Sequence, residues 1–450
     1  MSYVNDAIAA ISTPPGQGAV AVLRLSGKDA LTIAAKVFRG RQRPAEATPR
    51  VQNFGTIVDN SGTVVDQVLL TVFRSPASYT GEDLVEIGCH GGALVTRRIL
   101  ELLLSAGARA AEPGEFTQRA FLNGKMDLTQ AEAVMDLISA QTSLALRSAN
   151  EQLEGRLGGA ITAAREDLLN VLAHVEAYID FPEEDISPET GSALKARMEK
   201  VANLLDGLLA TANRGRILRE GVRTVICGAP NVGKSSLLNV LLGFERAIVS
   251  DVAGTTRDTI EEAIQVRGLP LRLVDTAGVH AATDAIEKEG IERTQRQLAG
   301  ADLILEIVDA HLPDQTRITL PVDSQAKHIL VLNKTDLGLH PNWEGTQGVA
   351  LSCTAGSGLE LLCDAIFDLL ADGMGENSAS MVAINARHYD CMSRARDYLT
   401  AAMAGLDNND SPEYTALEIR SALDAIGEVV GKVDAEELLG VIFGSFCIGK

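Results

Sequence analysis

The pattern of apolar and polar positions changes along the chain, and its first part mixes two periods. Short stretches rich in apolar residues predict strands, and a stretch with apolar residues three and four apart predicts a helix. The strands are expected at Ala19–Leu25, Gln67–Phe73 and Leu84–Gly88, and the helix at Ala93–Ala106. Residues 1–120 are therefore predicted to form an α+β domain.

From residue 128 to about 214 the spacing is helical throughout. Two apolar stripes show it, formed by Ala131, Val134, Met135 and Ile138, and by Leu168, Leu169, Leu172 and Val175. An acidic break lies at residues 180–185. Helical spacing returns after a Gly/Asn/Ser linker (373–380), through Tyr389–Leu406 and Ala416–Leu439. We expect one helical domain from residues 121–215 plus 380–450, with residues 216–376 inserted between its halves. A linear string of domains is the alternative.

The inserted stretch alternates strands and helices, as a doubly wound α/β domain does. Strands are predicted at Val222–Cys227, Leu271–Val274 and Ile329–Leu332, and a helix at Ser236–Leu242. Between the first strand and this helix, residues 228–235 read Gly-Ala-Pro-Asn-Val-Gly-Lys-Ser. This is a phosphate-binding loop in its expected context: backbone N–H groups surround the phosphates, Lys234 reaches the β- and γ-phosphates, and Ser235 ligates Mg²⁺.

Two later motifs predict that the nucleotide is GTP. Asp275-Thr276-Ala277-Gly278 and Asn333-Lys334-Thr335-Asp336 each follow an apolar strand. The Asp336 carboxylate can accept both the N1–H and the exocyclic amine of guanine, a donor pair that adenine lacks. Residues 352–355, which begin with Ser352, either complete the guanine pocket through backbone N–H groups or form an ordinary serine-rich loop. The predicted nucleotide-binding residues are Asn231, Val232, Gly233, Lys234, Ser235, Ser236, Ser250, Asp251, Val252, Ala253, Gly254, Thr255, Thr256, Asp275, Thr276, Ala277, Gly278, Asn333, Lys334, Asp336 and Ser352.

Composition limits the partners of this chain of 450 residues. Its formal net charge is −20 and its pI is about 4.8, so a nucleic acid must meet a local basic patch or be held largely by a partner protein. There is no apolar run of membrane-spanning length and no secretion signal, which predicts a cytoplasmic protein without membrane contact. The six cysteines form no Cys-x-x-Cys pair, so no zinc site or disulfide framework is expected.

Hydrolysis is expected to differ from that of a Ras-type switch. The position of the Ras-type glutamine, two residues beyond Gly278, holds His280. A histidine can contact the attacking water but is more often a surface residue, so a polar residue of the loop 281–290 is expected to act on that water. Glu287 is the leading candidate, with Asp284 and Glu289 as rivals. Thr256 is expected to complete the Mg²⁺ shell. The amide oxygen of Asn231 either ligates a monovalent cation, which would replace an arginine finger, or caps the loop locally.

Four further stretches complete the pattern: residues 13–18 (TPPGQG), 78–83 (SYTGED), 114–121 (GEFTQRAF) and the terminal Cys447-Ile448-Gly449-Lys450. Together with the phosphate loop, the D-x-A-G-T-T-R-D stretch, D-T-A-G and N-K-x-D, they make the whole chain resemble the tRNA-modification GTPase family (MnmE, also called TrmE). The resemblance implies a multidomain α/β protein: an N-terminal α+β domain that dimerises and binds a folate, a helical domain, and an inserted Ras-like P-loop GTPase domain. It also implies an FAD-dependent partner (MnmG, or GidA) in a heterotetramer or larger complex, and tRNA as substrate.

Residue roles follow from the same resemblance. Potassium would be held by Asn231, Ser250, Val252 and Thr255, and Mg²⁺ by Ser235 and Thr256. Glu287 falls on the family's water-activating glutamate. A 5-formyl- or methylene-tetrahydrofolate would meet Arg24, Glu86, Lys125 and Lys450. Cys447 matches a cysteine proposed to assist the modification; it is either a thiolate nucleophile or a residue that packs the tail into the dimer.

Two functions of different classes are compatible with a GTPase module. The first is an enzyme, a potassium-stimulated GTPase whose cycle drives addition of a carboxymethylaminomethyl or aminomethyl group to C5 of the wobble uridine (position 34) of certain tRNAs. The second is a regulatory GTP switch in ribosome assembly or signalling. The folate-type N-terminus and the C-I-G-K tail favour the first.

Overall fold

The structure is a computed structural model that describes residues 6–180, 191–244, 261–274, 297–313, 317, 326–370, 383–408, 410–432, 436–444 and 446–449. The chain divides into two compact units. One comprises Met1–Met135, Leu153–Leu194 and Ala401–Lys450, and the other Asp136–Gln152 and Lys195–Thr400. The boundaries between the units fall within helices: α4 (Leu128–Ser139), the last residue of α5 (Ser143–Leu153), α7 (Gly191–Leu209) and α12 (Ala386–Asp407).

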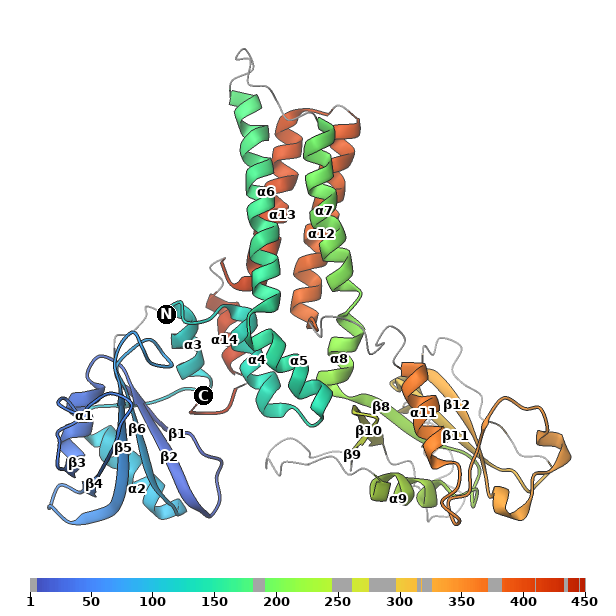
Figure 1. Ribbon diagram of the computed structural model, residues 1–450, viewed down its shortest axis with the longest axis horizontal. Coiled ribbons are helices and arrows are strands. Elements are labelled where there is room, and N and C mark those ends of the chain that lie inside the picture. Colours follow the sequence, from blue (N-terminus) through green and yellow to red (C-terminus); the bar gives the residue numbers. More distant parts are fainter. Residues whose placement is uncertain are drawn as a thin grey trace, which may run out of the picture. The chain divides into compact units, whose positions relative to one another are not determined.

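The first unit contains a seven-stranded sheet in the order β3-β4-β5-β6-β2-β1-β7 (Figure 1). Its pairs are antiparallel except β1 with β7. The three predicted strands and the predicted helix are all present, each within a few residues of its expected bounds. The elements are β1 (Ile8–Ile11), β2 (Gly18–Ser26), α1 (Ala30–Val37), β3 (Phe38–Gly40), β4 (Gln52–Val58), β5 (Val64–Phe73), β6 (Leu84–Gly91), α2 (Ala93–Ser105) and β7 (Arg109–Ala110).

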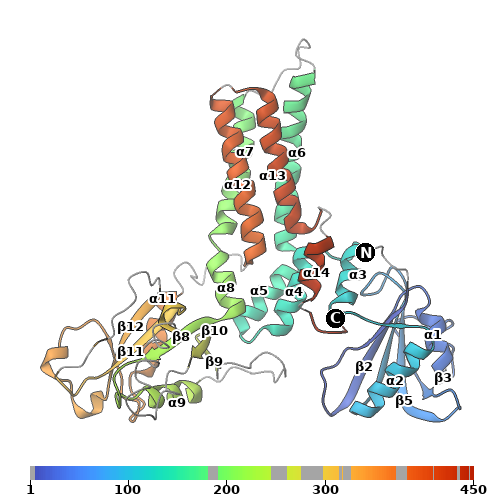
Figure 2. The same ribbon diagram turned by 180° about the vertical axis from the view of Figure 1, so that it is seen from behind.

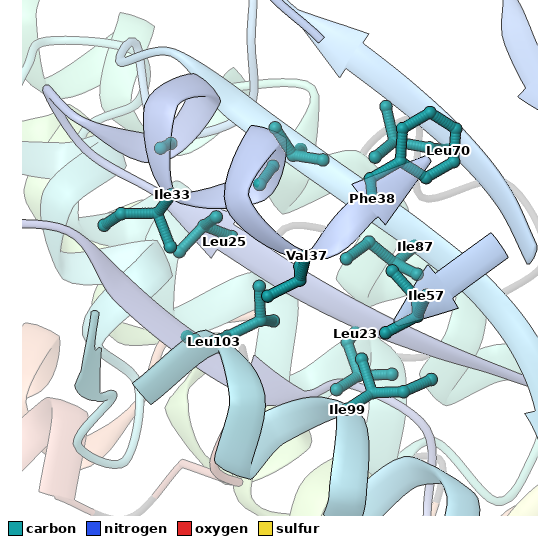
Figure 3. Packing of buried hydrophobic residues seen from close by; sticks show 14 of the residues in the cluster. Leu23, Leu25, Ile33, Val37, Phe38, Ile57, Leu70, Ile87, Ile99 and Leu103 are labelled. Carbon is teal, nitrogen blue, oxygen red and sulfur yellow. The ribbon is translucent and has the colours of Figure 1, made fainter. Parts of the chain in front are cut away.

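Helices α1 and α2 cover one face of this sheet. Alternation along the strands sends one set of side chains into the core, where sheet residues such as Leu23 and Ile87 meet Val37 of α1 and Ile99 of α2 (Figure 3). The other set, which includes Arg24 and Glu86 on paired strands, lies on the opposite, open face. The open face therefore carries the side chains that are available to a ligand.

The remaining helices of this unit include α3 (Glu115–Leu122), α6 (Arg156–Asp180), α13 (Pro412–Val430) and α14 (Glu436–Gly444). Helix α6 runs along α13 in both views (Figures 1 and 2), with an ion pair of 2.7 Å between Glu176 and Arg420. The helical stretch predicted at Ala416–Leu439 is not one helix. Gly431 adopts a left-handed φ of 78°, and a Cβ there would lie 2.6 Å from the Phe121 ring, so α13 ends at this glycine.

The second unit contains the predicted doubly wound domain. Its six-stranded sheet has the order β13-β12-β11-β8-β10-β9 and is parallel except at β9. Helices α9 and α11 pack on one face, through Leu237 and Leu241 of α9 and Leu362 and Ile366 of α11. The elements are β8 (Val222–Cys227), α9 (Lys234–Phe244), β9 (Glu261–Val266), β10 (Leu269–Val274), β11 (Leu303–Asp309), β12 (Lys327–Asn333), η2 (Thr335–Leu337), η3 (Pro341–Trp343), β13 (Val349–Ala350) and α11 (Leu359–Leu370).

This unit also contains α8 (Ala212–Glu220), nearly all of α5 (Ser143–Leu153) and parts of α4, α7 and α12. Helix α7 precedes the nucleotide-binding sheet in the sequence and α12 follows it. The two helices lie side by side in both views (Figures 1 and 2), and Asp206 of α7 lies 3.7 Å from Arg396 of α12. A helix that precedes the sheet in the sequence and a helix that follows it therefore contact each other; the insertion itself stays a prediction.

Candidate functional site

The phosphate-binding loop connects β8 to α9. Its backbone is left-handed at Asn231 (φ 63°) and at Gly233 (φ 107°), and Gly228 has a φ of 149°. A Cβ at Gly228 would lie 2.2 Å from the Ile307 carbonyl oxygen, and one at Gly233 would lie 2.2 Å from Asn333 Nδ2. Both glycines are therefore required by close approach as well as by backbone conformation.

Lys234 is the first residue of α9, and its ammonium group turns back over the loop. Nζ donates to the carbonyl oxygens of Gly228 and Ala229, at 2.9 and 2.8 Å. Partial burial lowers the pKa of Lys234. Ser235 and Ser236 are exposed on the first helical turn, where a phosphate and its metal ion can reach them.

The guanine motif is joined to this loop by Asn333. Its side chain is buried, donates from Nδ2 to the Val232 carbonyl oxygen at 2.8 Å, and accepts from the Cys353 amide at 3.2 Å. Asn333 therefore ties the phosphate loop to the base-binding edge and does not face a base itself. The same hydrogen bond holds the backbone of Val232, whose side chain is also buried.

Asp336 is held by Ser352, which is wholly buried. The Ser352 hydroxyl donates to Asp336 Oδ1 at 2.6 Å and accepts from the Ala355 amide at 3.1 Å. The carboxylate is thereby oriented before any base binds.

Residues 352–355 are expected either to offer backbone amides to guanine or to form an ordinary loop, and three of their four amides are engaged within the protein. The Ser352, Cys353 and Ala355 amides donate to Ser357 O, Asn333 Oδ1 and Ser352 Oγ. Among the described residues, the Thr354 amide is the one of the four that makes no hydrogen bond, so a base can use it without displacing a contact.

Asp309 completes this edge and was not among the predicted site residues. It ends β11, is mostly buried, and accepts from Lys334 Nζ at 2.6 Å and from the His311 amide at 3.1 Å. Lys334 has a left-handed φ of 63°, and this ion pair fixes its side chain. The signal in the sequence is an acidic residue at the end of a largely apolar strand, in which Glu306 is the one other charged residue; an aspartate after an apolar strand is also what marks Asp275.

Several predicted residues lie outside the described part of the chain. These are Ser250, Asp251, Val252, Ala253, Gly254, Thr255, Thr256, Asp275, Thr276, Ala277, Gly278, Lys450, Glu287 and its rivals Asp284, Glu289 and His280. Asn231 is described and exposed, and within the described residues its side chain makes no hydrogen bond.

The open face of the N-terminal sheet holds a second group of candidates. Arg24 Nε and Glu86 Oε1 lie 2.9 Å apart across β2 and β6, and the Arg24 guanidinium lies 5.4 Å from the centroid of the Tyr79 ring. Lys125 Nζ donates to the Pro76 carbonyl oxygen at 3.0 Å. The loop 75–83 thus contacts both Arg24 and Lys125, and three of the four predicted folate-binding residues border one region.

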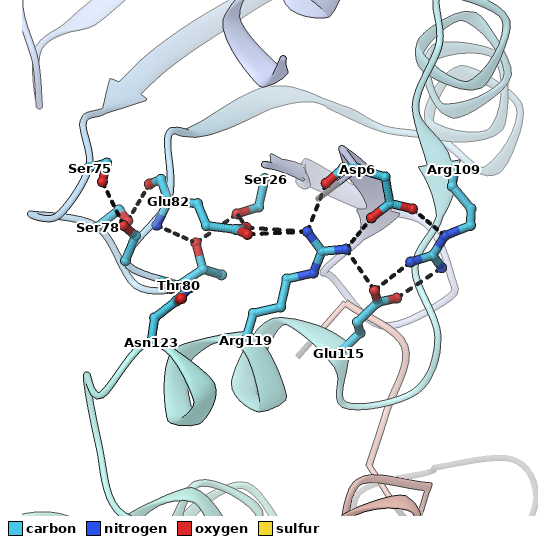
Figure 4. Close-up of polar contacts among 11 residues, drawn as sticks. Asp6, Ser26, Ser75, Ser78, Thr80, Glu82, Arg109, Glu115, Arg119 and Asn123 are labelled. Atoms are coloured by element: carbon cyan, nitrogen blue, oxygen red, sulfur yellow. Dashed lines mark hydrogen bonds and ion pairs between the residues drawn. The ribbon is translucent and has the colours of Figure 1, made fainter. Parts of the chain in front are cut away.

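This loop is held in place by a buried charge network (Figure 4). Arg119 of α3 donates to Asp6 Oδ1 at 2.6 Å, to Glu115 Oε1 at 2.9 Å and to Glu82 Oε1 at 3.3 Å. Burial raises the pKa of Glu115, but hydrogen bonds from Arg109, the Glu112 amide and Arg119 outweigh it and hold that pKa below its usual value. The network fastens the loop 75–83 to β1 and α3.

The terminal segment lies beside the same domain. The Cys447 carbonyl oxygen accepts from the Gly114 amide at 3.4 Å, and Ile448 forms a bridge with Pro113. Gly449 has a φ of 93°, and a Cβ there would lie 2.6 Å from the Ile11 carbonyl oxygen. The Cys447 side chain is exposed. By contrast, Cys227 is buried in β8, and its pKa is raised by burial to about 12.

Among the described helices, none combines the length and apolar character that a bilayer span requires.

Comparison with known proteins places these sites in a family. The family model described as "MnmE helical domain" matches residues 128–447, and that described as "GTP-binding protein TrmE N-terminus" matches residues 7–125. Among individual proteins, the tRNA modification GTPase MnmE of Akkermansia muciniphila is 53% identical over 100% of both chains. That of Aquifex aeolicus is 45% identical over 99% of this chain and 100% of its own.

Solved structures give a weaker likeness. The G domain of the T. maritima FeoB iron transporter is 27% identical, covers 33% of this chain and 98% of its own length, and has a TM-score of 0.25. The two family matches and the full-length identities carry the assignment, and the predicted fold class is confirmed. The chain, a GTP-binding hydrolase, belongs to the tRNA modification GTPase MnmE family.

Proposed function

We propose that this protein is a potassium-stimulated GTP hydrolase. With an FAD-dependent partner (MnmG or GidA), it adds a carboxymethylaminomethyl or aminomethyl group to C5 of the wobble uridine of certain tRNAs in the cytoplasm. The observation that carries the proposal is a preformed guanine edge, with Asp336 held by Ser352 and Asn333 tied to Val232. It occurs in a chain 53% identical along its whole length to a tRNA modification GTPase.

At the phosphate end, the chain's own residues bind and orient the nucleotide. Lys234 exchanges the two loop carbonyl oxygens for phosphate oxygens, and Ser235 with Thr256 holds Mg²⁺. Glu287 orients and activates the attacking water. Asn231, Ser250, Val252 and Thr255 hold a potassium ion, which supplies the positive charge of an arginine finger.

The state of Asn231 supports its role in this set. An amide that caps the phosphate loop would hydrogen-bond to it, whereas this side chain is exposed and makes no hydrogen bond to any described residue. An exposed amide oxygen of this kind is a suitable ligand for a hard cation.

In the N-terminal domain, Arg24, Glu86, Lys125 and Lys450 are proposed to bind a 5-formyl- or methylene-tetrahydrofolate. The Glu86 carboxylate suits the N–H donors of a pterin, and the cations suit the glutamyl tail. Support comes from the position of the Arg24–Glu86 pair on the open sheet face, above Tyr79. Cys447 lies close to this domain, with an exposed thiol that is available to assist the modification.

A homodimer is proposed through the same domain. The open sheet face exposes Phe54 and Leu69, which are cross-strand neighbours with exposed fractions of 63% and 41%. Exposed apolar pairs of this kind favour burial against a second copy. The dimer would then join the FAD-dependent partner in a heterotetramer or larger complex.

The test compares GTP hydrolysis in potassium and in sodium buffer, and the modification of wobble uridine in cells that lack the protein. We expect faster hydrolysis in potassium and loss of the C5 substituent in the cells. Equal slow rates in both buffers, with normal wobble uridines, would favour a regulatory switch in ribosome assembly or signalling.

A further inference from the structure

Charge is distributed unevenly along this acidic chain. Residues 1–125 carry 13 Lys or Arg against 11 Asp or Glu, whereas the remaining 325 residues carry 27 against 49. A polyanion is repelled by an acidic surface and is attracted to a local basic one. The N-terminal domain is therefore the part of the chain on which a nucleic acid can be held.

Within that domain, the cations gather in one stretch, residues 36–50, called here the basic segment. It has a single acidic residue, Glu46, against five basic residues, all exposed: Lys36, Arg39, Arg41, Arg43 and Arg50. The segment runs from the end of α1 through β3 to the start of β4, and β3 is an edge strand of the sheet. These charges therefore border one edge of the domain.

The five cations of the basic segment differ in their contacts from Arg97 and Arg98, two exposed arginines of the same domain. Arg39 donates to the carbonyl oxygens of Ala35 and Phe38, at 3.0 and 2.9 Å. In the described part of the chain, none of the five cations forms an ion pair with a carboxylate. Arg97 and Arg98 of α2, in contrast, both pair with Glu101. Within the described residues, the positive charge of the basic segment is thus not neutralised by an ion pair.

The basic segment also adjoins the proposed folate site. Arg50 Nη2 donates to the Ala77 carbonyl oxygen at 3.1 Å, and Ala77 lies in the loop 75–83, whose Tyr79 packs under Arg24. Arg74 connects the basic segment with this loop. It donates to the carbonyl oxygen of Ala45 in the segment, and it pairs with Asp83 in the loop. A strand of RNA bound along the basic segment would end beside the site where the one-carbon donor is proposed to bind.

We propose that the basic segment binds the phosphate backbone of tRNA. Four of its five cations are arginines, whose planar guanidinium groups bind phosphate through two parallel hydrogen bonds. Such contacts position an RNA without reading its sequence. The proposal rests on the tRNA-modifying function proposed above and names the surface that function requires.

The test uses the full-length protein and a tRNA transcript. Arg41→Gln/Arg43→Gln removes two cations for which the described structure shows no side-chain hydrogen bond, so folding should be unaffected. Arg97→Gln/Arg98→Gln is the matched control, with the same charge change at arginines that already pair with Glu101. Affinity is measured between about 50 and 200 mM salt. GTP hydrolysis is measured in parallel and should match wild type in both variants.

We expect the Arg41/Arg43 variant to bind tRNA about tenfold more weakly. The slope of log affinity against log salt should fall by about 2, one for each cation lost. The control should keep both values. Arg41→Glu/Arg43→Glu should weaken binding further by repulsion.

Unchanged affinity and slope in the Arg41/Arg43 variants would overturn the proposal, as would a wild-type protein that does not bind tRNA. Normal tRNA binding with loss of the FAD-dependent partner would assign the surface to that protein instead. None of these results refutes the wobble-uridine function, which is tested separately by the modification state of tRNA in cells that lack the protein.

Discussion

The buried charge network of the N-terminal domain permits a quantitative prediction for Arg119→Met. The Arg119 side chain is only 4% exposed and donates to Asp6, Glu82 and Glu115, whose side chains are 25%, 13% and 9% exposed. Methionine fills much of the same volume but donates no hydrogen bond. The substitution therefore removes the shared cation from one buried carboxylate, Glu115, and from two partly buried ones, Asp6 and Glu82.

Removing one partner from a buried ion-pair network costs about 3 to 5 kcal/mol. Arg109 continues to pair with Glu115, so we expect the lower end, about 3 kcal/mol, which is roughly a 150-fold change in an opening equilibrium. Arg98→Met is the control. Arg98 is 51% exposed and pairs with Glu101 at 3.0 Å, so its loss should cost well under 1 kcal/mol.

The cost is measured by hydrogen–deuterium exchange of the β1 and α3 amides in the full-length protein. This method reports the stability of the N-terminal domain, whereas a global unfolding curve of a multidomain chain does not.

The pH dependence tests whether the stability lost in Arg119→Met comes from the charge network. The lowered pKa values of Asp6 and Glu115 mean that the network stabilises fully above the unfolded pKa values, near 4, and that this stability is lost as pH falls through the folded values. The gap between wild type and Arg119→Met should therefore shrink below about pH 4. A gap below 1 kcal/mol at neutral pH, or one that is constant down to pH 3, would refute the reasoning.

Three further predictions concern the proposed sites. Ser352→Ala removes the 2.6 Å hydrogen bond to Asp336 and should weaken GDP binding, measured by calorimetry, by about 1.5 to 3 kcal/mol, or roughly 10- to 150-fold; unchanged affinity would mean that Asp336 needs no support. Glu287→Ala should keep GTP affinity but lose turnover in a single-turnover assay, and normal turnover would move the catalytic role to Asp284 or His280. Glu86→Gln should weaken binding of 5-formyltetrahydrofolate about tenfold or more while GTP hydrolysis stays at the wild-type rate; equal folate affinity would exclude Glu86 from that site.

The fold was largely predictable because period-two and helical patterns reflect burial on a sheet or a helix face. β8 was predicted to the residue, and α2 within one residue. The helical pattern was less informative about exposure and ends. Ile138 and Leu169 continue the apolar stripes but are 45% and 39% exposed, and Gly431 ends a helix because of its contact with Phe121, which lies far away in the sequence.

The site was predictable where a motif bonds locally and was not where distant residues meet. The phosphate loop is one such local unit. The support that Ser352 gives to Asp336 depends on β12 and β13 lying side by side, and the Asp309–Lys334 pair depends on the register of β11 and β12. Likewise, the ion pair of Arg24 with Glu86 follows from their positions opposite each other on β2 and β6.

The two ends of the nucleotide site are prepared differently. Asn333 lies 101 residues from Val232 in the sequence, yet their hydrogen bond fixes the base edge to the phosphate loop before a nucleotide is present. We therefore expect guanine to meet groups that are already oriented, so that little of its binding energy is needed to order them. The motifs expected to sense the γ-phosphate lie elsewhere, immediately before β9 and after β10. We therefore expect the γ-phosphate to act on motifs that are separate from the base edge, so that the hydrogen bonds of Asn333 and Ser352 are the same with GTP and with GDP bound.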